Sequence, residues 1–347
     1  MPDYVEALKK EIALTPKWRQ EDSIETIYLG GGTPSLLSKE MLQEILNEVQ
    51  LHFKTSPDVE ICLEANPDDI SETSLSHWKA LGINRLSVGI QSFDASELKW
   101  MNRAHTAGES LQCLQFIKAA GFDNFSIDLI YGSNLQSHEI LLKNLATVFE
   151  MQVPHISAYA LTVEPGTTLH HQIQKKLQPN TNADHQATQF EILMSEMEKA
   201  GYEQYEISNF SKPGFRSRHN SSYWQGKPYY GFGASAHAYD GDKIRRWNIA
   251  NNSLYIQSLQ QGTLPFEEER LTSTQQLNEY IMISLRTVEG LDTDGVSLKF
   301  GTQKTAELKR KSEKFISNGL LQFRGEKIVL TNRGKFLADG IASDLFF

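Results

Sequence analysis

The chain has 347 residues, of which 39% are hydrophobic and 22% charged, and its formal net charge is −9. This composition is ordinary for a globular protein with one large domain and a smaller appendage, and the negative charge argues against a nucleic-acid partner, whose phosphates require a basic surface. No apolar run is long enough to span a membrane and Met1–Val5 does not resemble a signal peptide, so we expect a cytoplasmic protein that is not an integral membrane protein.

Strand and helix patterns alternate along the first two thirds of the chain. A helix is predicted over the first residues, around Val5, Leu8 and Ile12. Strands are predicted after it at 24–29, 59–64, 85–91, 125–130, 155–162 and 203–207. Helices are predicted between them, the clearest starting at the Ser38 cap and at the Thr106–Glu109 capping box. Repeated alternation of this kind implies right-handed crossovers and a parallel sheet.

Polar and glycine-rich residues gather where these predicted strands end. The set comprises Gly30–Thr33, Glu64–Pro67, Gln91-Ser92, Asp128, Tyr131-Gly132 and Thr162–Glu164. In a βα-barrel all of them line one rim, whereas an open doubly wound sheet concentrates ligand groups at one switch point. The spread over five strand ends favours an incomplete (β/α) TIM-like barrel, either a half or a three-quarter barrel.

The last third of the chain has a different pattern. Residues 208–260 read as loop-rich, and the chain becomes helical from about 270. Two short strands at 319–323 and 327–330 and a helix at 332–339 then suggest a small α+β, winged-helix-like domain. We therefore expect a barrel domain over 1–215, a connecting region over 216–265 and a C-terminal domain over 266–347.

The two cysteines, Cys62 and Cys113, fall in a strand pattern and a helix pattern. Both are interpreted as small core residues. Two thiols cannot supply the three or four ligands of an iron–sulfur cluster or a structural zinc ion, so no metal-ligand set and no catalytic residue is predicted.

The predicted rim carries carboxylates (Glu64, Asp128), an amide (Gln91) and an arginine (Arg103) beside the glycine loop. Together these groups could hold the ammonium, carboxylate and ribose hydroxyls of S-adenosylmethionine. The alternatives are a tight strand–helix turn at the glycines and ordinary rim salt bridges or hydrogen bonds at the other positions.

The order of motifs identifies a resemblance. The chain resembles the radical S-adenosylmethionine proteins related to oxygen-independent coproporphyrinogen III oxidase over essentially its whole length. The matching segments are Tyr28-Leu-Gly-Gly-Gly-Thr-Pro-Ser35, Glu64-Ala-Asn-Pro67, Arg85–Phe93, Asn102-Arg103, Asp128–Gly132 and His155–Thr167. Within that family, Glu164–Thr167 and Arg218-His-Asn-Ser-Ser-Tyr-Trp224 resemble the HemW-type heme chaperone branch.

The resemblance implies roles for individual residues. S-adenosylmethionine would be contacted at its methionyl amino end and held by its carboxylate and ribose. The residues so implied are Gly31, Gly32, Thr33, Glu64, Gln91, Arg103, Asp128 and, flanking them, Ser211. Heme would bind at His219, Tyr223 and Trp224, for which packed aromatic residues and a satisfied histidine are the alternatives.

One part of the family pattern is absent. The family's Cys-x₃-Cys-x₂-Cys loop and the strand before it have no counterpart in this sequence, so the 4Fe–4S cluster expected for the family cannot be ligated by this chain. We therefore expect the chain to be a truncated form. A smaller departure is Asn134, where relatives have proline.

The resemblance implies heme binding and transfer to membrane-bound respiratory acceptor proteins. The alternative is the enzyme of porphyrin biosynthesis, oxygen-independent coproporphyrinogen III oxidase, whose radical chemistry needs the missing cluster. His237 as a second heme ligand and a homodimeric state are open alternatives.

Overall fold

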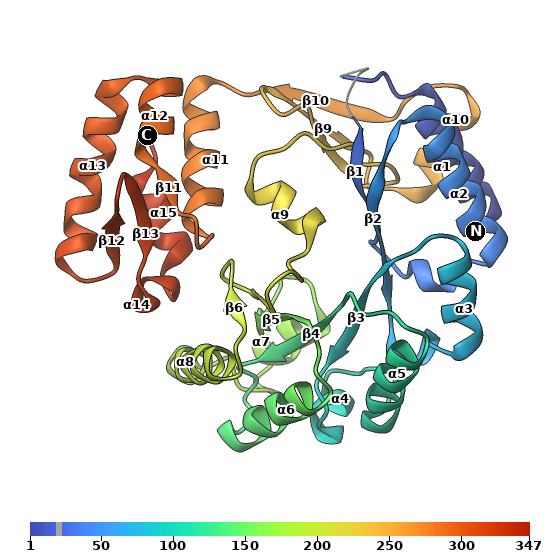
Figure 1. The fold of residues 1–347 in the computed structure, drawn as a ribbon, viewed down its shortest axis with the longest axis horizontal. Coiled ribbons are helices and arrows are strands. Elements are labelled where there is room, and N and C mark those ends of the chain that lie inside the picture. Colours follow the sequence, from blue (N-terminus) through green and yellow to red (C-terminus); the bar gives the residue numbers. More distant parts are fainter. Residues whose placement is uncertain (19–22) are drawn as a thin grey trace. The chain divides into compact units, whose positions relative to one another are not determined.

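The computed structural model describes residues 1–18 and 23–347 (Figure 1). These residues form two compact units. The terminal unit contains residues 1–27, 38–59 and 218–347, and the central unit contains residues 28–37 and 60–217. Both ends of the chain belong to one unit, whereas the sequence predicted three segments that follow one another. The predicted boundaries at 215 and 265 stay a prediction.

The main sheet has seven strands in the order β1-β2-β3-β4-β5-β7-β6 (Figure 1). Its strands are β1 (Ile24–Leu29), β2 (Thr55–Ala65), β3 (Arg85–Gln91), β4 (Phe125–Tyr131), β5 (His155–Ala160), β6 (Glu203–Gln204) and β7 (Asn209–Ser211). The strands β2 to β5 pair in parallel, as their βα connections require. The order is linear and the sheet is open, which confirms the predicted incomplete barrel.

Six α-helices belong to the described residues of the central unit, and the start of α5 is the predicted one. They are α3 (Glu72–Ala80), α4 (Ala95–Trp100), α5 (Ala107–Ala119), α6 (His138–Glu150), α7 (Thr168–Gln174) and α8 (Ala183–Lys199). The hydroxyl of Thr106 accepts from the Glu109 amide while the Glu109 carboxylate accepts from the Thr106 amide, which is the predicted capping box. Gly82 and Gly121 follow α3 and α5 with positive φ, as predicted for C-caps.

The end of the main sheet differs from the prediction. The prediction of a parallel strand at 203–207 is wrong. Strand β6 covers only Glu203–Gln204, and it pairs antiparallel with β7, which in turn pairs antiparallel with β5. A tight turn causes the reversal, since the Tyr205 amide donates to the Asn209 carbonyl at 3.2 Å. The turn is stabilised by Glu206, whose carboxylate accepts from the Ser208 amide at 2.9 Å.

A buried polar cluster lies between β3, β4 and the helices that follow them. The carboxylate of Glu97 is 2% exposed and accepts hydrogen bonds from Ser92 (2.6 Å), Ser133 (3.2 Å), Gln136 (3.0 Å) and Asn144 (3.4 Å). These four uncharged donors satisfy the buried carboxylate. The cluster holds the loops that follow β3 and β4 against each other, directly beyond Gln91 at the end of β3.

The terminal unit combines α1 (Pro2–Leu14), α2 (Lys39–His52), α9 (Arg218–Trp224) and α10 (Asn252–Gln260) with a sheet of order β10-β9-β8. The strands are β8 (His237–Tyr239), β9 (Ile244–Asn248) and β10 (Phe266–Arg270). The prediction of a loop-rich 208–260 is therefore wrong in part. The missed strands are polar, and their pairing is supported by the ion pair of Arg246 with Glu268, 2.8 Å apart across β9 and β10.

The buried carboxylate of Glu11 ties α1 to this region. It accepts hydrogen bonds from the Gly233 amide at 2.7 Å and from the side chains of Asn248 and Tyr255. Burial raises the pKa of Glu11, and these three donors oppose the rise. Loss of this one side chain would leave several buried donors without an acceptor.

The C-terminal part of the terminal unit is the predicted α+β domain. It contains α11 (Ser273–Leu285), α12 (Thr293–Phe300), α13 (Thr302–Ser317), α14 (Asn332–Lys335) and α15 (Ala338–Leu345). The antiparallel sheet β11-β13-β12 joins β11 (Leu291–Asp292), β12 (Leu321–Arg324) and β13 (Lys327–Leu330). Its core includes Leu277, Ile281, Val296, Leu308 and Ile328, all at most 1% exposed.

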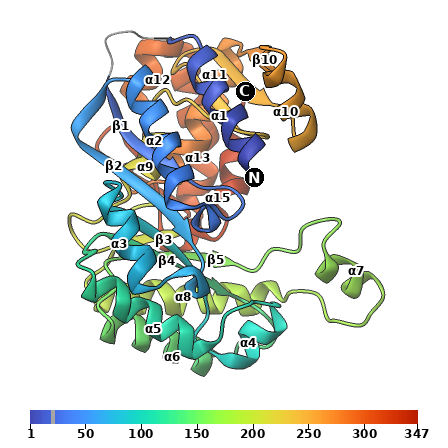
Figure 2. The same cartoon turned by 90° about the vertical axis from the view of Figure 1, so that its right-hand side faces the viewer.

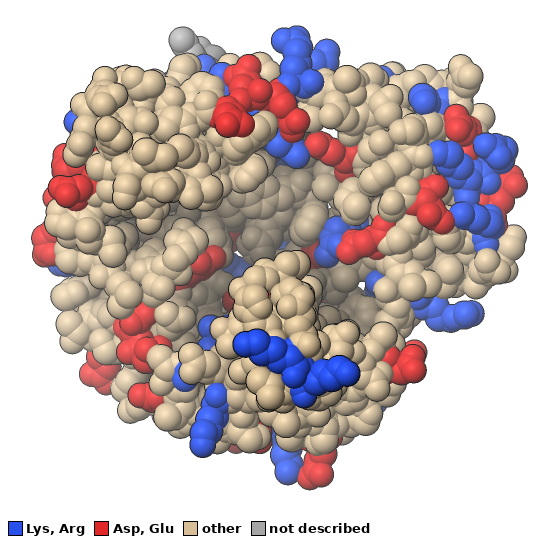
Figure 3. Space-filling model, turned by 180° about the vertical axis from the view of Figure 1, so that it is seen from behind, with Lys and Arg blue, Asp and Glu red and all other residues tan. Residues whose placement is uncertain are grey.

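Two surface features complete the description. The short helix α7 stands on a long excursion from the rest of the central unit (Figure 2). On the face that Figure 3 shows, acidic and basic side chains are interspersed in small groups. Among the described residues, no helix combines the length and the apolar character needed to cross a bilayer.

Candidate functional site

The glycine loop after β1 is held by one carboxylate of the next strand. Glu64, on β2, accepts a hydrogen bond from the Tyr28 hydroxyl at 2.6 Å and from the Gly31 amide at 3.1 Å. A Cβ at Gly30 would lie 2.4 Å from Tyr28 Cε1 and 2.8 Å from Glu64 Oε1, so only glycine fits there. Gly31 and Gly32 have φ of +76° and +84° with open space where a side chain would stand. The loop thus exposes bare backbone next to a carboxylate.

A second carboxylate, Asp128 on β4, lies near the first. Burial and the negative charge of Glu64 raise the pKa of Asp128 to about 7, against the opposing effects of Ser157 and Arg103. Arg103 follows α4, and its amide donates to the Leu98 carbonyl at 3.0 Å. Burial lowers the pKa of Arg103 while the charge of Asp128 raises it. The structure therefore brings together Glu64, Asp128 and Arg103, as the sequence predicted.

Gln91 ends β3 in an unusual backbone conformation. Its φ is +66°, rare for a residue with a side chain, and the register between β3 and β4 shifts between Val88 and Gln91. The Gln91 side chain is 8% exposed, and its amide nitrogen would lie 3.1 Å from a Cβ at Gly89. The bulge re-aims this amide at the end of the strand, a place where backbone strain accompanies function in many proteins.

Two further predicted residues, Thr33 and Ser211, lie in different surroundings. Thr33 directly precedes the short 3₁₀ helix Pro34–Leu36 and its side chain forms no capping bond there. Ser211 is on β7, fully buried, with a hydroxyl that has no hydrogen-bond partner in the described structure. The register places Ser211 beside His155 at the start of β5, away from the carboxyl ends of the parallel strands. Its role as a ligand residue stays a prediction.

The β7 residue at the level of Asp128 is Asn209. Asp128 pairs with Ser157, and Ser157 pairs with Asn209, whose side-chain oxygen accepts from the Ser157 hydroxyl at 2.8 Å. Sequence reasoning did not select Ser157, Asn209 or Tyr28. The antiparallel return of β7, which places Asn209 here, has no signal in the local hydrophobic pattern. Tyr28, two residues before Gly30, was visible in the sequence.

The chemistry of these residues fits S-adenosylmethionine. The exposed backbone at Gly31 and Gly32 admits a ligand, the Glu64 and Asp128 carboxylates suit an ammonium group and ribose hydroxyls, and Arg103 suits a carboxylate. Each oxygen of Glu64 has a second lone pair beyond the bond that it already accepts.

The described residues do not fit an iron–sulfur cluster. Cys62 and Cys113 are both buried and free, and burial raises the pKa of each thiol to about 12, which disfavours the thiolate that ligates iron. No group of three histidine, cysteine or acidic side chains able to hold a metal ion occurs among residues 1–18 and 23–347. The prediction of two buried core thiols is confirmed.

His219 lies on α9, which the sequence did not predict as a helix. Its Nδ1 is 2.8 Å from the Thr26 hydroxyl and its Nε2 is 3.1 Å from the Tyr223 hydroxyl. Burial lowers the pKa of His219 to about 4, so the imidazole is neutral at physiological pH. A neutral imidazole is the form that ligates iron, and the hydrogen bond at its other nitrogen orients it.

Aromatic side chains form a chain of contacts that starts at this histidine. The rings of His219 and Tyr223 are in an edge contact with centroids 5.0 Å apart, and Tyr223 contacts Tyr229 in the same way at 4.7 Å. Tyr223 is 39% exposed. The Trp224 ring lies 5.4 Å from the guanidinium carbon of Arg286. The edge of this group is thus accessible, as a surface that receives a planar ligand must be.

His237 begins β8 and is exposed, with its ring 6.4 Å from that of Trp247. Whether it is a second heme ligand stays open. The adjacent His170 and His171 lie on α7.

Comparisons with family descriptions match two parts of the chain. Residues 2–145 match the radical SAM superfamily, and residues 271–337 match the HemN C-terminal domain. The C-terminal match coincides with the α+β domain built on α11 to α14.

Curated relatives extend over the whole chain. The heme chaperone HemW of Bacillus subtilis is 33% identical over 98% of this chain and 90% of that protein. HemW of Mycobacterium tuberculosis is 33% identical over 99% of this chain and 86% of that protein. HemW of Escherichia coli is 32% identical over 83% of this chain and 75% of that protein.

Among solved structures, coproporphyrinogen III oxidase (HemN) from Escherichia coli, a radical SAM enzyme, superposes with a TM-score of 0.82. The alignment covers 99% of this chain and 83% of that chain at 23% identity. At this identity the likeness establishes the fold, and it agrees with the open parallel sheet described above.

Proposed function

The chain belongs to the HemW heme chaperone family of radical S-adenosylmethionine proteins, and from this premise we propose that it binds heme and transfers it to acceptor proteins. The observation that carries the proposal is His219, a neutral and partly buried imidazole oriented by the Thr26 hydroxyl. The Tyr223 ring contacts this imidazole, and the Tyr229 ring contacts that of Tyr223.

Heme is the cargo in this proposal. The iron would be bound by Nε2 of His219, after the Tyr223 hydroxyl that now occupies that nitrogen has moved away. The exposed ring of Tyr223 and the ring of Trp224 would lie against the porphyrin, whose flat apolar faces stack on aromatic side chains.

S-adenosylmethionine is the proposed second ligand. The Gly31 and Gly32 backbone and Thr33 would contact its methionyl amino end, while Glu64, Gln91, Arg103 and Asp128 would hold its carboxylate and ribose. Ser211 would flank this site. When bound, this molecule supplies an activated sulfonium carbon, and the protein groups named here do no more than bind and orient it.

The 4Fe–4S cluster that accompanies this family is a separate matter. The two buried thiols of this chain do not form a ligand set for it. No radical step is therefore assigned to these residues, and oxidative decarboxylation of coproporphyrinogen III, the competing function, lacks the group that would reduce S-adenosylmethionine.

The proposed acceptors are membrane-bound respiratory heme proteins, and the proposed location is the cytoplasm. A homodimer is compatible with this role.

A heme titration tests the proposal. Hemin added to the purified chain should give a Soret band shift that saturates at one equivalent, and His219→Ala should abolish the shift or weaken binding more than about tenfold. His52→Ala is the matched control, because it replaces a histidine elsewhere in the terminal unit. Equal hemin affinity in His219→Ala and the wild type would refute the assignment, and turnover of coproporphyrinogen III would support the enzyme instead.

A further inference from the structure

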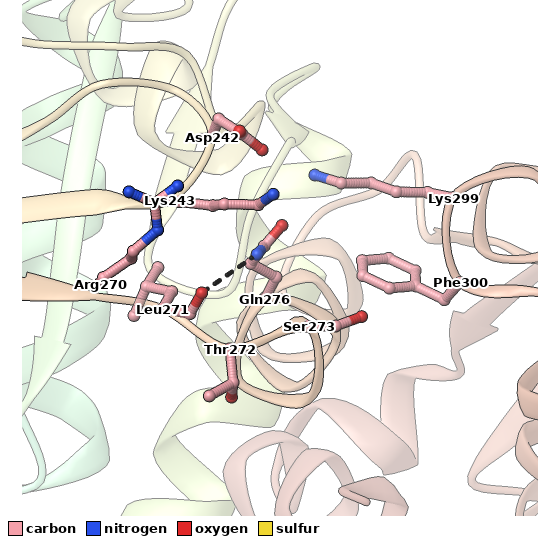
Figure 4. A pocket seen from close by; sticks show the side chains of 9 residues that line it. All are labelled: Asp242, Lys243, Arg270, Leu271, Thr272, Ser273, Gln276, Lys299 and Phe300. Atoms are coloured by element: carbon pink, nitrogen blue, oxygen red, sulfur yellow. Dashed lines mark hydrogen bonds between the residues drawn. The ribbon is translucent and has the colours of Figure 1, made fainter.

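A pocket of about 550 Å³ opens in the terminal unit between the β8–β10 sheet and the C-terminal domain (Figure 4). We call it the cationic pocket. Its lining residues are Asp242, Lys243, Arg270, Leu271, Thr272, Ser273, Gln276, Lys299 and Phe300. The volume is in the range of small-molecule sites in proteins. None of these residues takes part in the heme and S-adenosylmethionine sites proposed above.

Two of the cations are fixed by the sheet. Lys243 precedes β9, where its carbonyl accepts from the Leu271 amide at 2.8 Å. Arg270 pairs with Ile244 at the end of β10, so Lys243 and Arg270 lie at the same end of these two strands. The turn before β9 is held by Asp240, which accepts from the amides of Asp242 and Lys243 at 2.8 Å each. The backbone that presents Lys243 is thus well ordered.

The third cation comes from another element. Lys299 is near the end of α12, and its ammonium lies 5.5 Å from the ring of Phe300. In Figure 4 the ammonium groups of Lys243 and Lys299 point toward each other over Gln276. Within residues 1–18 and 23–347, none of the three cations has a carboxylate within ion-pair distance, although the chain carries 43 acidic residues against 34 Lys and Arg.

Convergent cations without anions repel one another, and the arrangement is unfavourable unless solvent ions or a ligand supply negative charge. Three cations face one acid, Asp242, so the pocket carries a net charge of +2 in a chain of net charge −9. The first turn of α11, represented by Ser273 and Gln276, also lines the pocket and adds the positive end of a helix dipole.

We propose that the cationic pocket binds a small oxyanion with two or more negative charges. Two flexible ammonium groups on opposite walls can each contact a different oxygen, while Arg270 offers a planar pair of donors. Leu271 and Phe300 supply apolar wall, so an anion with a short carbon skeleton fits as well as an inorganic one. Phosphates and polycarboxylates share this chemistry.

Calorimetric titration with two probes, pyrophosphate and citrate, tests the proposal at about 150 mM salt, where exposed long-range electrostatics are screened. We expect saturable binding of at least one probe with one site per chain. Pyrophosphate alone identifies a phosphate-type ligand, and citrate alone identifies a carboxylate-type ligand. The absence of binding of both probes at this salt concentration would overturn the proposal.

Three variants distinguish a built site from general charge attraction. Lys243→Gln and Lys299→Gln should each weaken binding about tenfold, because each removes a charged hydrogen-bond donor. Asp242→Asn should strengthen binding, a change that a damaged pocket would not give. Lys309→Gln is the control, since Lys309 lies on α13 and pairs with Glu326 at 3.2 Å. Equal affinities in all four variants would refute the site. Hemin titration of the same variants reports on the heme proposal separately.

Discussion

The imidazole Nδ1 of His219 lies 2.8 Å from the hydroxyl oxygen of Thr26, although 193 residues separate them in the chain. Iron binding through Nε2 requires the tautomer with the proton on Nδ1, and in that tautomer Nδ1–H donates to the Thr26 oxygen. In the proposed heme complex Thr26 would therefore orient the ligating imidazole. It carries no feature in the sequence that marks it for this role.

Replacing Thr26 with valine should weaken hemin binding. The variant keeps the shape of the side chain but removes the acceptor for Nδ1–H, and loss of such an outer hydrogen bond typically costs about 10–100-fold in metal affinity. Hemin titration measures the effect, and Thr26→Ser, which retains the hydroxyl, should bind like the wild type. Wild-type affinity in Thr26→Val would show that the contact is only structural.

Replacing Tyr223 with phenylalanine should strengthen hemin binding. The hydroxyl of Tyr223 occupies Nε2 of His219 at 3.1 Å, and the iron must displace it. A hydrogen bond of this kind is worth about 0.5–1.5 kcal/mol, so we expect about two- to tenfold tighter binding with the ring retained. Tyr223→Leu removes the ring as well and should bind more weakly than Tyr223→Phe. A weaker Tyr223→Phe would mean that the hydroxyl contacts the heme.

The pH dependence of hemin binding follows from the lowered pKa of His219, about 4. The neutral imidazole is present above this pKa, so ligation should be constant from pH 8 to pH 5 and should be lost only as the pH falls through about 4. The Soret band of the complex, followed across this range at fixed hemin concentration, checks the expectation. Loss of the band near pH 6.5, the usual pKa of histidine, would contradict it.

Asp128→Asn should stabilise the protein, and more so at high pH. In the folded state the pKa of Asp128 is raised from its usual 3.8 to about 7. The contribution of Asp128 to the stability of the fold is therefore fully present below about pH 4 and is lost as the pH rises through 7. Asparagine removes this loss, which amounts to on the order of 2–4 kcal/mol at pH 8. Urea unfolding at pH 5 and pH 8 measures it, with the exposed Asp123→Asn as the control. An equal gain at both pH values would contradict the assignment.

Gly30→Ala should destabilise the glycine loop by steric contact. Its Cβ would meet Tyr28 and Glu64 well inside contact distance, and overpacking of this kind costs about 1–3 kcal/mol. The shift of Glu64 should also lower the affinity for S-adenosylmethionine, measured by calorimetry. Gly31→Ala is the comparison, because its Cβ meets nothing and only its positive φ is strained, at about 1–2 kcal/mol. If Gly31→Ala lowered ligand affinity as much, backbone strain would be the cause in both variants.

Glu97→Gln should unfold more readily than the wild type. The glutamine amide would place donors against the hydroxyls and amides that now donate to the carboxylate, and an unsatisfied buried group costs about 1–3 kcal/mol. Urea unfolding measures the loss, and Glu139→Gln, at an exposed ion pair with Lys143, should change stability by less than about 0.5 kcal/mol. Equal stability of the two variants would contradict a role for the buried cluster.

Much of the main sheet could be predicted from local patterns. The bounds of β1 and β3 are those predicted, and the Ser38 cap and the Thr106–Glu109 capping box form as expected. The carboxyl ends of parallel strands also lie at one edge of the sheet, and this rule was enough to bring Glu64 and Asp128 together.

What failed depends on contacts that are distant in the sequence. The strands β9 and β10 are rich in arginine and glutamate, and only their pairing through Arg246 and Glu268 makes them strands. Alternation of apolar residues could not reveal them, although the opposite charges across the register were a usable signal. Thr26 and Asn209 were missed for a related reason. Thr26 contacts His219 on the distant helix α9, and Asn209 reaches Ser157 only through the antiparallel turn before β7.

The bonds of Glu11 have a consequence for the order in which the protein is made. Its partners Gly233, Asn248 and Tyr255 follow it by 222, 237 and 244 residues, so translation must continue for on the order of 10–50 s before this carboxylate can be satisfied. Residues 28–37 and 60–217 of the central unit leave the ribosome earlier. Meanwhile Ala7, which is packed with Tyr255 and Leu259 in the finished protein, lacks these partners on the emerging chain. The N-terminal helix is thus the segment of this chain that a ribosome-associated holdase would have to shield longest.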